Sequence, residues 1–263
     1  MPNLSDKVAV VTGASKGVGK GVALGLAEAG ATVYATGRTS SEETFTSDER
    51  VIPVPCDHTL DAETEAAFKR IIDEQGRLDI LVNSVWGGYE NMLENGEFTW
   101  SRPFWQQPIW RWDAMFQAGV RAHYVASQLA AQVMVAQRSG LIVNISFWAA
   151  QKHIGNVAYG VSKAATDKLT ADMSHELREY NVAVVSLYPG LVRTEKVMQA
   201  AEWLDLSNSE SPQFIGRAAA ALASDPGMIE RTGKVLVAAS LAQEYGFTDI
   251  DGKSPKPLTL SDV

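Results

Sequence analysis

Three polar side chains near the middle of the chain could act on a carbonyl or alcohol group. Residues 141–146 form an apolar run that ends in Ser146, so this hydroxyl is expected where a buried strand reaches the sheet edge. Tyr159 and Lys163 lie four residues apart in a segment with helical periodicity, which places both side chains on one helix face, one turn apart. A hydroxyl, a phenol and an ammonium group at one sheet edge indicate proton transfer to or from a substrate oxygen, provided that a hydride donor binds nearby.

A glycine-rich turn near the N-terminus is the predicted site for that donor. Residues 7–11 are a short β-branched run, and Gly13, Gly17 and Gly19 connect it to an Ala- and Leu-rich helical segment that ends near Gly30. Gly13 permits a tight turn, and the other two glycines allow the backbone to approach a pyrophosphate. The helix N-terminus adds free N–H groups and a positive dipole end. An ordinary turn is the alternative, but the flanking strand and helix favour dinucleotide binding.

The residues after the second and third strands indicate which dinucleotide binds. Strand 31–36 is followed by Arg38 with no acid beside it, and Lys16 lies in the glycine turn. An Arg at this place accepts the 2′-phosphate of NADP, whereas an acid would hold the 2′-hydroxyl of NAD, so NADP(H) is favoured over NAD(H). A surface Arg without a ligand is the alternative. Asp57, just after the third strand, could cap a turn or contact adenine.

The remaining pattern alternates strands with helices throughout. Near-continuous apolar strands between amphipathic helices predict an α/β fold, a doubly wound parallel sheet of about seven strands with helices on both faces. No linker or repeat interrupts the pattern, so residues 1–263 are expected to form one domain. The expected strands are 7–11, 31–36, 51–55, 78–82, 141–146, 182–187 and 234–238. The expected helices run from the glycine turn to Gly30 and over 60–75, 110–138, 159–180 and 212–223, with at most one helical turn in 39–50.

Two connections are long enough to form a substrate site. Residues 86–112 hold five of the seven Trp residues and leave the carboxyl end of a strand, where ligands bind in open α/β sheets. This insert could form an aromatic wall around an apolar substrate, or instead an oligomer contact or a satellite core. Residues 191–212, after the turn at Pro189 and Gly190, are expected to cover the site as a substrate loop with a short mobile helix.

Composition restricts the partners of the protein. The formal net charge of −8 argues against nucleic acid and anionic membranes as main partners. No apolar run is long enough to span a membrane, and Cys56 is the single cysteine, which favours a reducing, cytoplasmic location. We predict no metal site.

In combination, these motifs resemble the short-chain dehydrogenase/reductase family. Their order along the chain is Thr12-Gly-Ala-Ser-Lys-Gly-Val-Gly19, Asp57, Asn83, Tyr159-Gly-Val-Ser-Lys163 and Pro189-Gly190. The resemblance covers nearly the whole chain and implies a Rossmann-type fold. It also implies Ser146, Tyr159 and Lys163 as catalytic residues. Implied for cofactor binding are Gly13, Ser15, Lys16, Gly17, Val18, Gly19, Arg38, Asp57, Asn83, Tyr159, Lys163, Pro189, Gly190, Val192 and Thr194.

The implied function is hydride transfer between the nicotinamide and a carbonyl or alcohol carbon of a fairly large apolar substrate. Tyr159 would be the acid/base and Ser146 would donate a hydrogen bond to the oxyanion. Because a free tyrosine has a pKa near 10, we expect Lys163 and the oxidised nicotinamide to lower the pKa of Tyr159. The resemblance further implies a homodimer or homotetramer, formed through the helices at 110–138 and 159–180.

Three departures from the family pattern favour a second hypothesis. Ser84, Val85 and Trp86 follow Asn83 where relatives usually have Ala-Gly. Gly119 stands where an Asn commonly completes a proton relay, so water or backbone would have to carry it. Phe147 stands where many relatives have a second, catalytic serine, and a one-residue slip decides which side chain faces the substrate. The alternative is therefore a nucleotide-binding sensor or scaffold with a decayed catalytic site.

Overall fold

The computed structural model describes residues 2–45, 48–90, 92–94 and 96–263. Its main element is a seven-stranded parallel sheet with the strand order β3-β2-β1-β4-β7-β8-β9. This arrangement confirms the expected doubly wound fold. The strands are β1 (Val8–Thr12), β2 (Thr32–Gly37), β3 (Val51–Pro55), β4 (Ile80–Asn83), β7 (Gly140–Ile145), β8 (Val182–Tyr188) and β9 (Val235–Val237).

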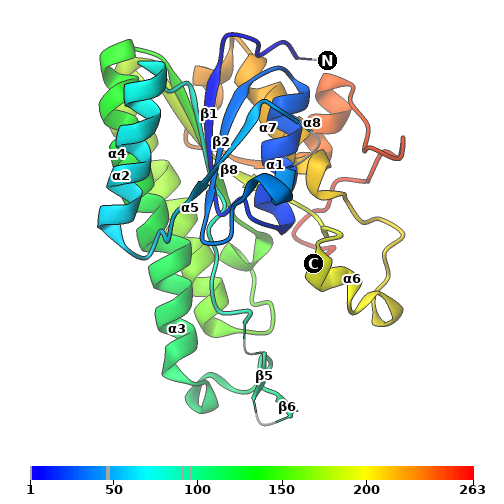
Figure 1. The fold of residues 1–263 in the computed structure, drawn as a ribbon. Helices are drawn as coiled ribbons and strands as arrows, with labels where there is room; N and C mark the ends of the chain where they lie inside the picture. The colour runs from blue at the N-terminus through cyan, green and yellow to red at the C-terminus, as the bar shows by residue number, and fades with distance from the viewer. Residues whose placement is uncertain (1, 46–47, 91, 95) are drawn as a thin grey trace.

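Helices cover both faces of this sheet, with an apolar core on each side (Figure 1). One layer contains α1 (Gly17–Glu28), α7 (Pro212–Ser224) and α8 (Ala238–Tyr245). The other contains α2 (Asp61–Gln75), α4 (Ala122–Gln137) and α5 (Val157–Leu177). Helix α8 was not expected from the sequence; the other five match the expected helices to within a few residues, except that the predicted helix 110–138 is divided.

The sheet has its topological switch point between β1 and β4. From β1 the chain proceeds outward to β2 and β3, and then returns to place β4 on the other side of β1. Connections that diverge in this way leave a crevice at the carboxyl ends of the two strands, where open α/β sheets bind ligands. The glycine turn after β1 and the insert after β4 both begin at this crevice.

The contact between α1 and α7 requires glycine on both helices. A Cβ atom at Gly25 would lie 2.6 Å from the backbone of Gly216, a distance that real side chains do not adopt. Arg217 of α7 also pairs with Glu28 at the end of α1, at 2.7 Å. The C-terminal part of the chain therefore holds α1, and the glycine turn that precedes it, against the sheet.

The aromatic insert projects from the carboxyl edge of the sheet (Figure 1). It contains the two-stranded ribbon β5 (Leu93–Glu94) and β6 (Glu97–Phe98), the 3₁₀ turn η2 (Phe104–Gln106) and helix α3 (Ile109–Phe116). A π-helical turn, η3 (Gln117–Arg121), joins α3 to α4 and divides the expected helix. Residues 91 and 95 of the insert, and 46–47 of the segment 39–50, lie outside the described residues.

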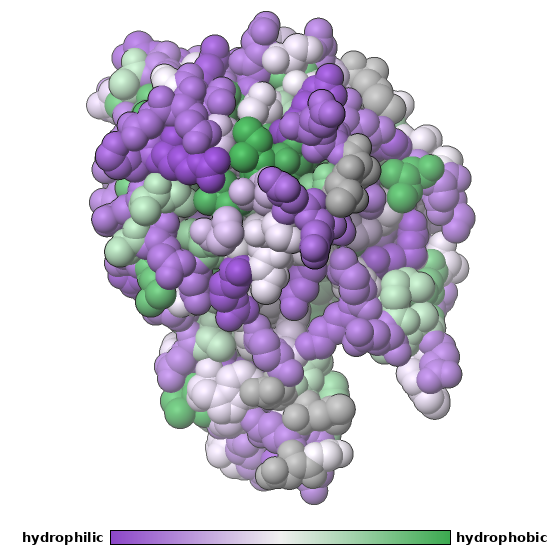
Figure 2. All heavy atoms as spheres, viewed as in Figure 1, coloured by the Kyte–Doolittle hydropathy of each residue, from purple (hydrophilic) through white to green (hydrophobic). Residues whose placement is uncertain are grey.

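Hydrophilic side chains cover most of the molecular surface on the face shown in Figure 2.

Short helices complete the chain, including the single turn expected within 39–50. They are η1 (Glu42–Phe45), η4 (Trp148–Ala150), η5 (Arg178–Tyr180), α6 (Glu195–Met198), η6 (Ala201–Trp203) and η7 (Met228–Arg231). Helix α6 and η6 lie in the predicted substrate loop. Within the part of the chain that the structure describes, no helix has the length and hydropathy needed to cross a bilayer.

Candidate active site

Tyr159 and Lys163 lie on one face of the first turns of α5, as their spacing predicts. The Asn156 side chain caps this helix by accepting a hydrogen bond from the Tyr159 backbone N–H at 3.1 Å. The ammonium of Lys163 donates to the carbonyl oxygen of Ile145, the last residue of β7, at 3.2 Å. Helix α5 therefore presents both side chains to the carboxyl edge of the sheet.

Four aromatic rings surround the Tyr159 phenol, and we call this group the aromatic enclosure. The ring centroids of Trp86 and Trp100 lie 5.5 Å from that of Tyr159, Tyr89 lies at 6.2 Å and Phe147 at 6.3 Å. Tyr159 is 8% exposed to solvent, and a side-chain hydrogen bond joins it to Tyr89. Three of the four rings come from the insert and pack with Tyr159 as a small apolar cluster apart from the main core, and their role as a wall around a substrate stays a prediction.

The surroundings of Tyr159 oppose the lowering of its pKa that Lys163 and the oxidised nicotinamide are expected to cause. Burial in the aromatic enclosure, together with the nearby Tyr89 phenol, raises the pKa of Tyr159 well above its usual value. Sequence spacing identified the cation one turn away but not the apolar rings around the phenol. With the enclosure closed, Tyr159 is a neutral phenol, which can donate a proton but does not readily lose one to solvent.

Lys163 is also deeply buried, with 7% exposure. Burial lowers the pKa of this ammonium to about 7, and the charge of Asp167 opposes the shift. The Trp86 ring lies 4.1 Å from the Lys163 nitrogen, so a cation–π contact partly replaces the water that the charge has lost. Lys163 is therefore poised to change protonation near neutral pH.

The Trp86 ring fills the space that a side chain at position 119 would occupy. A Cβ atom built on Gly119 would lie 2.6 Å from two carbons of the indole. The Gly119 carbonyl accepts a hydrogen bond from the Thr166 hydroxyl at 3.3 Å. The departures at 86 and 119 are thus one packing feature, because the indole occupies the space that a side chain at 119 would need.

Ser146 and Phe147 follow the end of β7 and face different neighbours. The Ser146 hydroxyl donates to the Lys163 carbonyl at 3.4 Å and is 1% exposed, whereas Phe147 is half-buried against Tyr159. At 3.4 Å this hydrogen bond is longer than usual and therefore weak. The role of Ser146 as oxyanion donor stays a prediction, and it requires this hydroxyl to rotate.

Tyr188 and Asp167 form a partly buried pair near Ser146 that was not expected from the sequence. The Tyr188 hydroxyl donates to the Asp167 carboxylate, and Gln151 donates to Tyr188 at 3.4 Å. Asp167 stands one turn beyond Lys163 on α5 and supplies the opposing charge noted above. No short-range motif connects these residues, because they come together only through packing of α5 on β8.

The glycine turn has the geometry of an anion site. A Cβ at Gly13 or Gly19 would meet backbone atoms at 2.8 and 2.3 Å, so both positions exclude side chains. The Gly17 N–H, at the start of α1, donates to the carboxylate of Glu195 at 2.9 Å. A carboxylate thus holds the place that suits a phosphate oxygen, and the residues here fit a dinucleotide pyrophosphate. Of the other predicted residues, Lys16 is exposed, and Ser15 and Val18 are half-buried beside the turn.

Arg38 and Asp57 lie near each other beyond β2 and β3. Arg38 is exposed. Burial would raise the pKa of Asp57, but hydrogen bonds from the Thr59 N–H and hydroxyl, with the charge of Arg38, outweigh it and lower this pKa. Of the two roles predicted for Asp57, the structure shows the turn cap, and the contact with adenine stays a prediction.

Asn83 faces the interior between β4 and its neighbours. It is fully buried, and its amide donates to Ser127 and Asn144, each at 2.9 Å. Asn144 in turn donates to Thr170 of α5 at 2.8 Å. The side chain of Asn83 therefore ties the strand ends together, and its predicted place beside the nicotinamide ribose remains untested.

The turn after β8 is held by a buried carboxyl group. The Glu210 side chain accepts a hydrogen bond from the Gly190 N–H at 2.7 Å. The backbone of Glu210 pairs with that of Val192 in an isolated parallel β-bridge. Burial raises the pKa of Glu210 to about 7. Pro189 and Val192 are buried, and Thr194 is half-buried with its methyl group near Gly17. The segment predicted to contact the carboxamide end thus lies beside the glycine turn.

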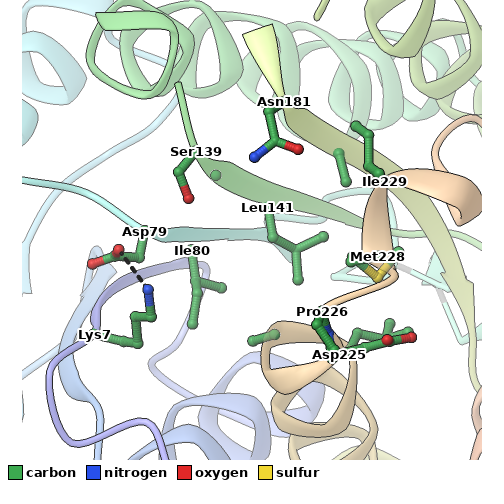
Figure 3. Close-up of a pocket in the computed structure, with 14 residues that line it drawn as sticks. Lys7, Asp79, Ile80, Ser139, Leu141, Asn181, Asp225, Pro226, Met228 and Ile229 are labelled. Atoms are coloured by element: carbon green, nitrogen blue, oxygen red, sulfur yellow. Dashed lines mark hydrogen bonds and ion pairs between the residues drawn. The ribbon is translucent and has the colours of Figure 1, made fainter. Parts of the chain in front are cut away.

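A separate pocket lies at the amino-terminal edge of the sheet (Figure 3). Lys7 and Asp79, paired at 3.3 Å, and Asn181 line it together with Met228 and Ile229. These residues precede β1, β4 and β8 or belong to η7, so the pocket is at the edge opposite Tyr159. None of the predicted site residues lines it.

Known proteins resemble this chain in sequence and in fold. Residues 7–205 match the family model described as short chain dehydrogenase. "Dehydrogenase/reductase SDR family member 1" of Mus musculus is 42% identical over 96% of this chain and 86% of its own length. The Homo sapiens protein of the same name is 40% identical, over 99% of this chain and 88% of its own. A solved structure of 7α-hydroxysteroid dehydrogenase complexed with NADH and 7-oxo glycochenodeoxycholic acid matches with a TM-score of 0.76 and 27% identity, covering 89% of this chain and 93% of that one.

Proposed function

The chain belongs to the short-chain dehydrogenase/reductase family, and from that premise we propose that it transfers a hydride between NADP(H) and a carbonyl or alcohol carbon of a fairly large apolar substrate. Family membership makes the protein an oxidoreductase. The finer proposal is carried by one observation: the Tyr159 phenol lies inside an aromatic enclosure, one turn from Lys163, at the carboxyl edge of the sheet.

The chain's own residues bind the dinucleotide and move the proton. Bound NADP(H) supplies or accepts the hydride. Tyr159 donates its phenolic proton to the substrate oxygen during reduction, and Lys163 orients the ribose and stabilises the phenolate that remains. Ser146 donates a hydrogen bond to the developing oxyanion after leaving the Lys163 carbonyl. The proposed cofactor residues are Gly13, Ser15, Lys16, Gly17, Val18, Gly19, Asp57, Asn83, Pro189, Gly190, Val192 and Thr194, with Arg38 for the 2′-phosphate.

The size and polarity of the substrate follow from the aromatic enclosure. We infer that the rings of Trp86, Tyr89 and Trp100 would contact an apolar molecule, while the phenol of Tyr159 would meet its oxygen. The hydroxysteroid dehydrogenase structure carries a bulky alicyclic ketone, which supports a ketone of similar bulk for this chain. That structure contains NADH, so the preference for NADP(H) rests on Arg38 and on the lack of an acid beside it.

The surface of α4 and α5 supports the proposal of self-association. Tyr124 on α4 and Val157 and Val161 on α5 are exposed large hydrophobic side chains. A homodimer or homotetramer would cover them. The proposed cytoplasmic location rests on the single cysteine, Cys56, which is buried.

A sensor or scaffold with decayed catalysis is the second candidate. Two observations favour it: Tyr159 is nearly covered by aromatic rings, and Trp86 occupies the space that a side chain at 119 would need. Both leave nucleotide binding possible while hindering substrate access. The intact Tyr159–Lys163 pair opposes it.

NADPH oxidation against a panel of bulky ketones, aldehydes and quinones tests the proposal. Tyr159→Phe is expected to lose about 10²–10⁴-fold in turnover while it still binds NADPH, because only the transferable proton is removed. Tyr124→Phe, which alters an exposed phenol on α4, is the matched control and should retain activity. Equal turnover by Tyr159→Phe would refute the mechanism, and tight NADPH binding without turnover across the panel would favour the scaffold.

A further inference from the structure

The glycine turn already holds an anion that belongs to the chain itself. Glu195 is the first residue of α6, and its carboxylate accepts the Gly17 N–H at 2.9 Å. Gly17 begins α1, where unpaired N–H groups and the helix dipole favour negative charge. The two residues are 178 positions apart, so this contact depends on how the substrate loop folds back over the turn.

The next residue of α6 reaches the aromatic enclosure. The Lys196 ammonium donates to the backbone carbonyl of Tyr89 and lies 5.9 Å from the centre of its ring. Tyr89 forms part of the enclosure and is hydrogen bonded to Tyr159. Consecutive side chains of one short helix thus hold the cofactor turn on one side and the wall of the substrate site on the other.

A dinucleotide phosphate and the Glu195 carboxylate cannot share this donor. Both are anionic, and two acceptors on one N–H would bring like charges into contact, which electrostatic repulsion opposes. Binding of the pyrophosphate must therefore expel Glu195. The backbone of α6 is short and is capped by Thr194, whose hydroxyl accepts from Val197 at 3.3 Å, so Glu195 and Lys196 move with the same turn.

We propose that Glu195 is a positioning residue that couples cofactor binding to substrate access. In the absence of cofactor, Glu195 holds α6 on the glycine turn and Lys196 holds Tyr89 in the closed enclosure. A bound dinucleotide phosphate displaces Glu195, α6 shifts, and Lys196 releases the wall around Tyr159. This inference rests on the proposed function.

The first test measures NADPH affinity by fluorescence titration. Glu195→Gln keeps the shape of the side chain but removes the competing charge, so it should bind NADPH about 5- to 10-fold more tightly than the wild type. Glu202→Gln, an exposed acid in η6 of the same loop, is the matched control and should bind like the wild type. Equal affinities of Glu195→Gln and the wild type would overturn the displacement. NADPH binding to none of the proteins would overturn the proposed cofactor itself.

The second test follows the enclosure by hydrogen exchange at residues 86–90. NADPH should speed exchange there in the wild type, because it withdraws Lys196 from the Tyr89 carbonyl. Lys196→Met should show fast exchange without NADPH and little further change with it. If bound NADPH slows hydrogen exchange at residues 86–90 of the wild type, or leaves it unchanged, the link between cofactor binding and substrate access is wrong. This holds even if Glu195→Gln binds NADPH more tightly.

Discussion

Gly119→Ala tests whether Trp86 determines the residue at position 119. A methyl group there would lie 2.6 Å from two indole carbons, about 1 Å closer than carbon atoms normally approach. The indole cannot easily retreat, because Lys163 lies 4.1 Å from its ring and Tyr89 and Tyr159 pack at 5.5 Å. Overpacking of this kind costs ~1–3 kcal/mol.

A smaller effect of opposite sign accompanies the clash. Alanine is favoured over glycine within a helix by up to ~1 kcal/mol. The net expectation for Gly119→Ala is a loss of ~1–2 kcal/mol in the free energy of unfolding, or roughly 2–8 °C in Tm for a chain of this size. In a Trp86→Ala background the clash is absent, so the same substitution should be neutral or stabilising by up to ~1 kcal/mol.

Urea unfolding of the four proteins in this cycle supplies the measurement. Fluorescence and circular dichroism must report coincident transitions, so that free energies can be compared. The expected coupling between positions 86 and 119 is ~1–3 kcal/mol. If Gly119→Ala has the same effect with and without the indole, the packing argument is wrong.

Two further predictions concern Arg38 and Glu210. Arg38→Ala should weaken NADPH binding by about 10- to 100-fold but NADH binding only slightly, because a charged hydrogen bond to the 2′-phosphate is lost. Arg50→Ala is the control, since Arg50 is exposed and lies 3.9 Å from Asp48. Equal losses of affinity for both cofactors in Arg38→Ala would refute the assignment. Burial raises the pKa of Glu210 to about 7, so the folded state retains a proton that the unfolded state has lost, and stability should fall by up to ~3 kcal/mol as the pH rises from about 4.5 to about 7. Glu210→Gln, which can still accept the Gly190 N–H, should flatten this dependence and unfold at higher urea than the wild type at pH 8; parallel pH curves would contradict the prediction.

The sequence predicted what depends on local pattern. Strands such as β1 and β8 are apolar runs buried on both faces, and the spacing of Tyr159 and Lys163 alone placed both on one face of α5. Helix α8 escaped prediction because it is eight residues long and follows β9 without a loop. Prediction from local sequence pattern succeeds where neighbours in sequence are also neighbours in space.

What the sequence could not supply are contacts between distant segments. Glu195 reaches Gly17, and Trp86 fills the space above Gly119, only because separate loops converge at the carboxyl edge. The pKa of Tyr159 is expected to fall because of Lys163 and the oxidised nicotinamide, but the sequence did not reveal the burial that raises this pKa. The sequence showed an aromatic insert after a strand. It did not show that rings of this insert pack against the phenol of Tyr159.

The glycine contact between α1 and α7 has a consequence for biosynthesis. Gly25 and Gly216 are separated by about 190 residues, which a ribosome adds in roughly 10–40 s. During that interval the nascent α1 lacks the helix that covers its glycine face. Newly made chains should therefore acquire protease resistance and NADPH binding together, and only after α7 has emerged. Chains truncated before residue 212 would lack α7 and leave the glycine face of α1 uncovered.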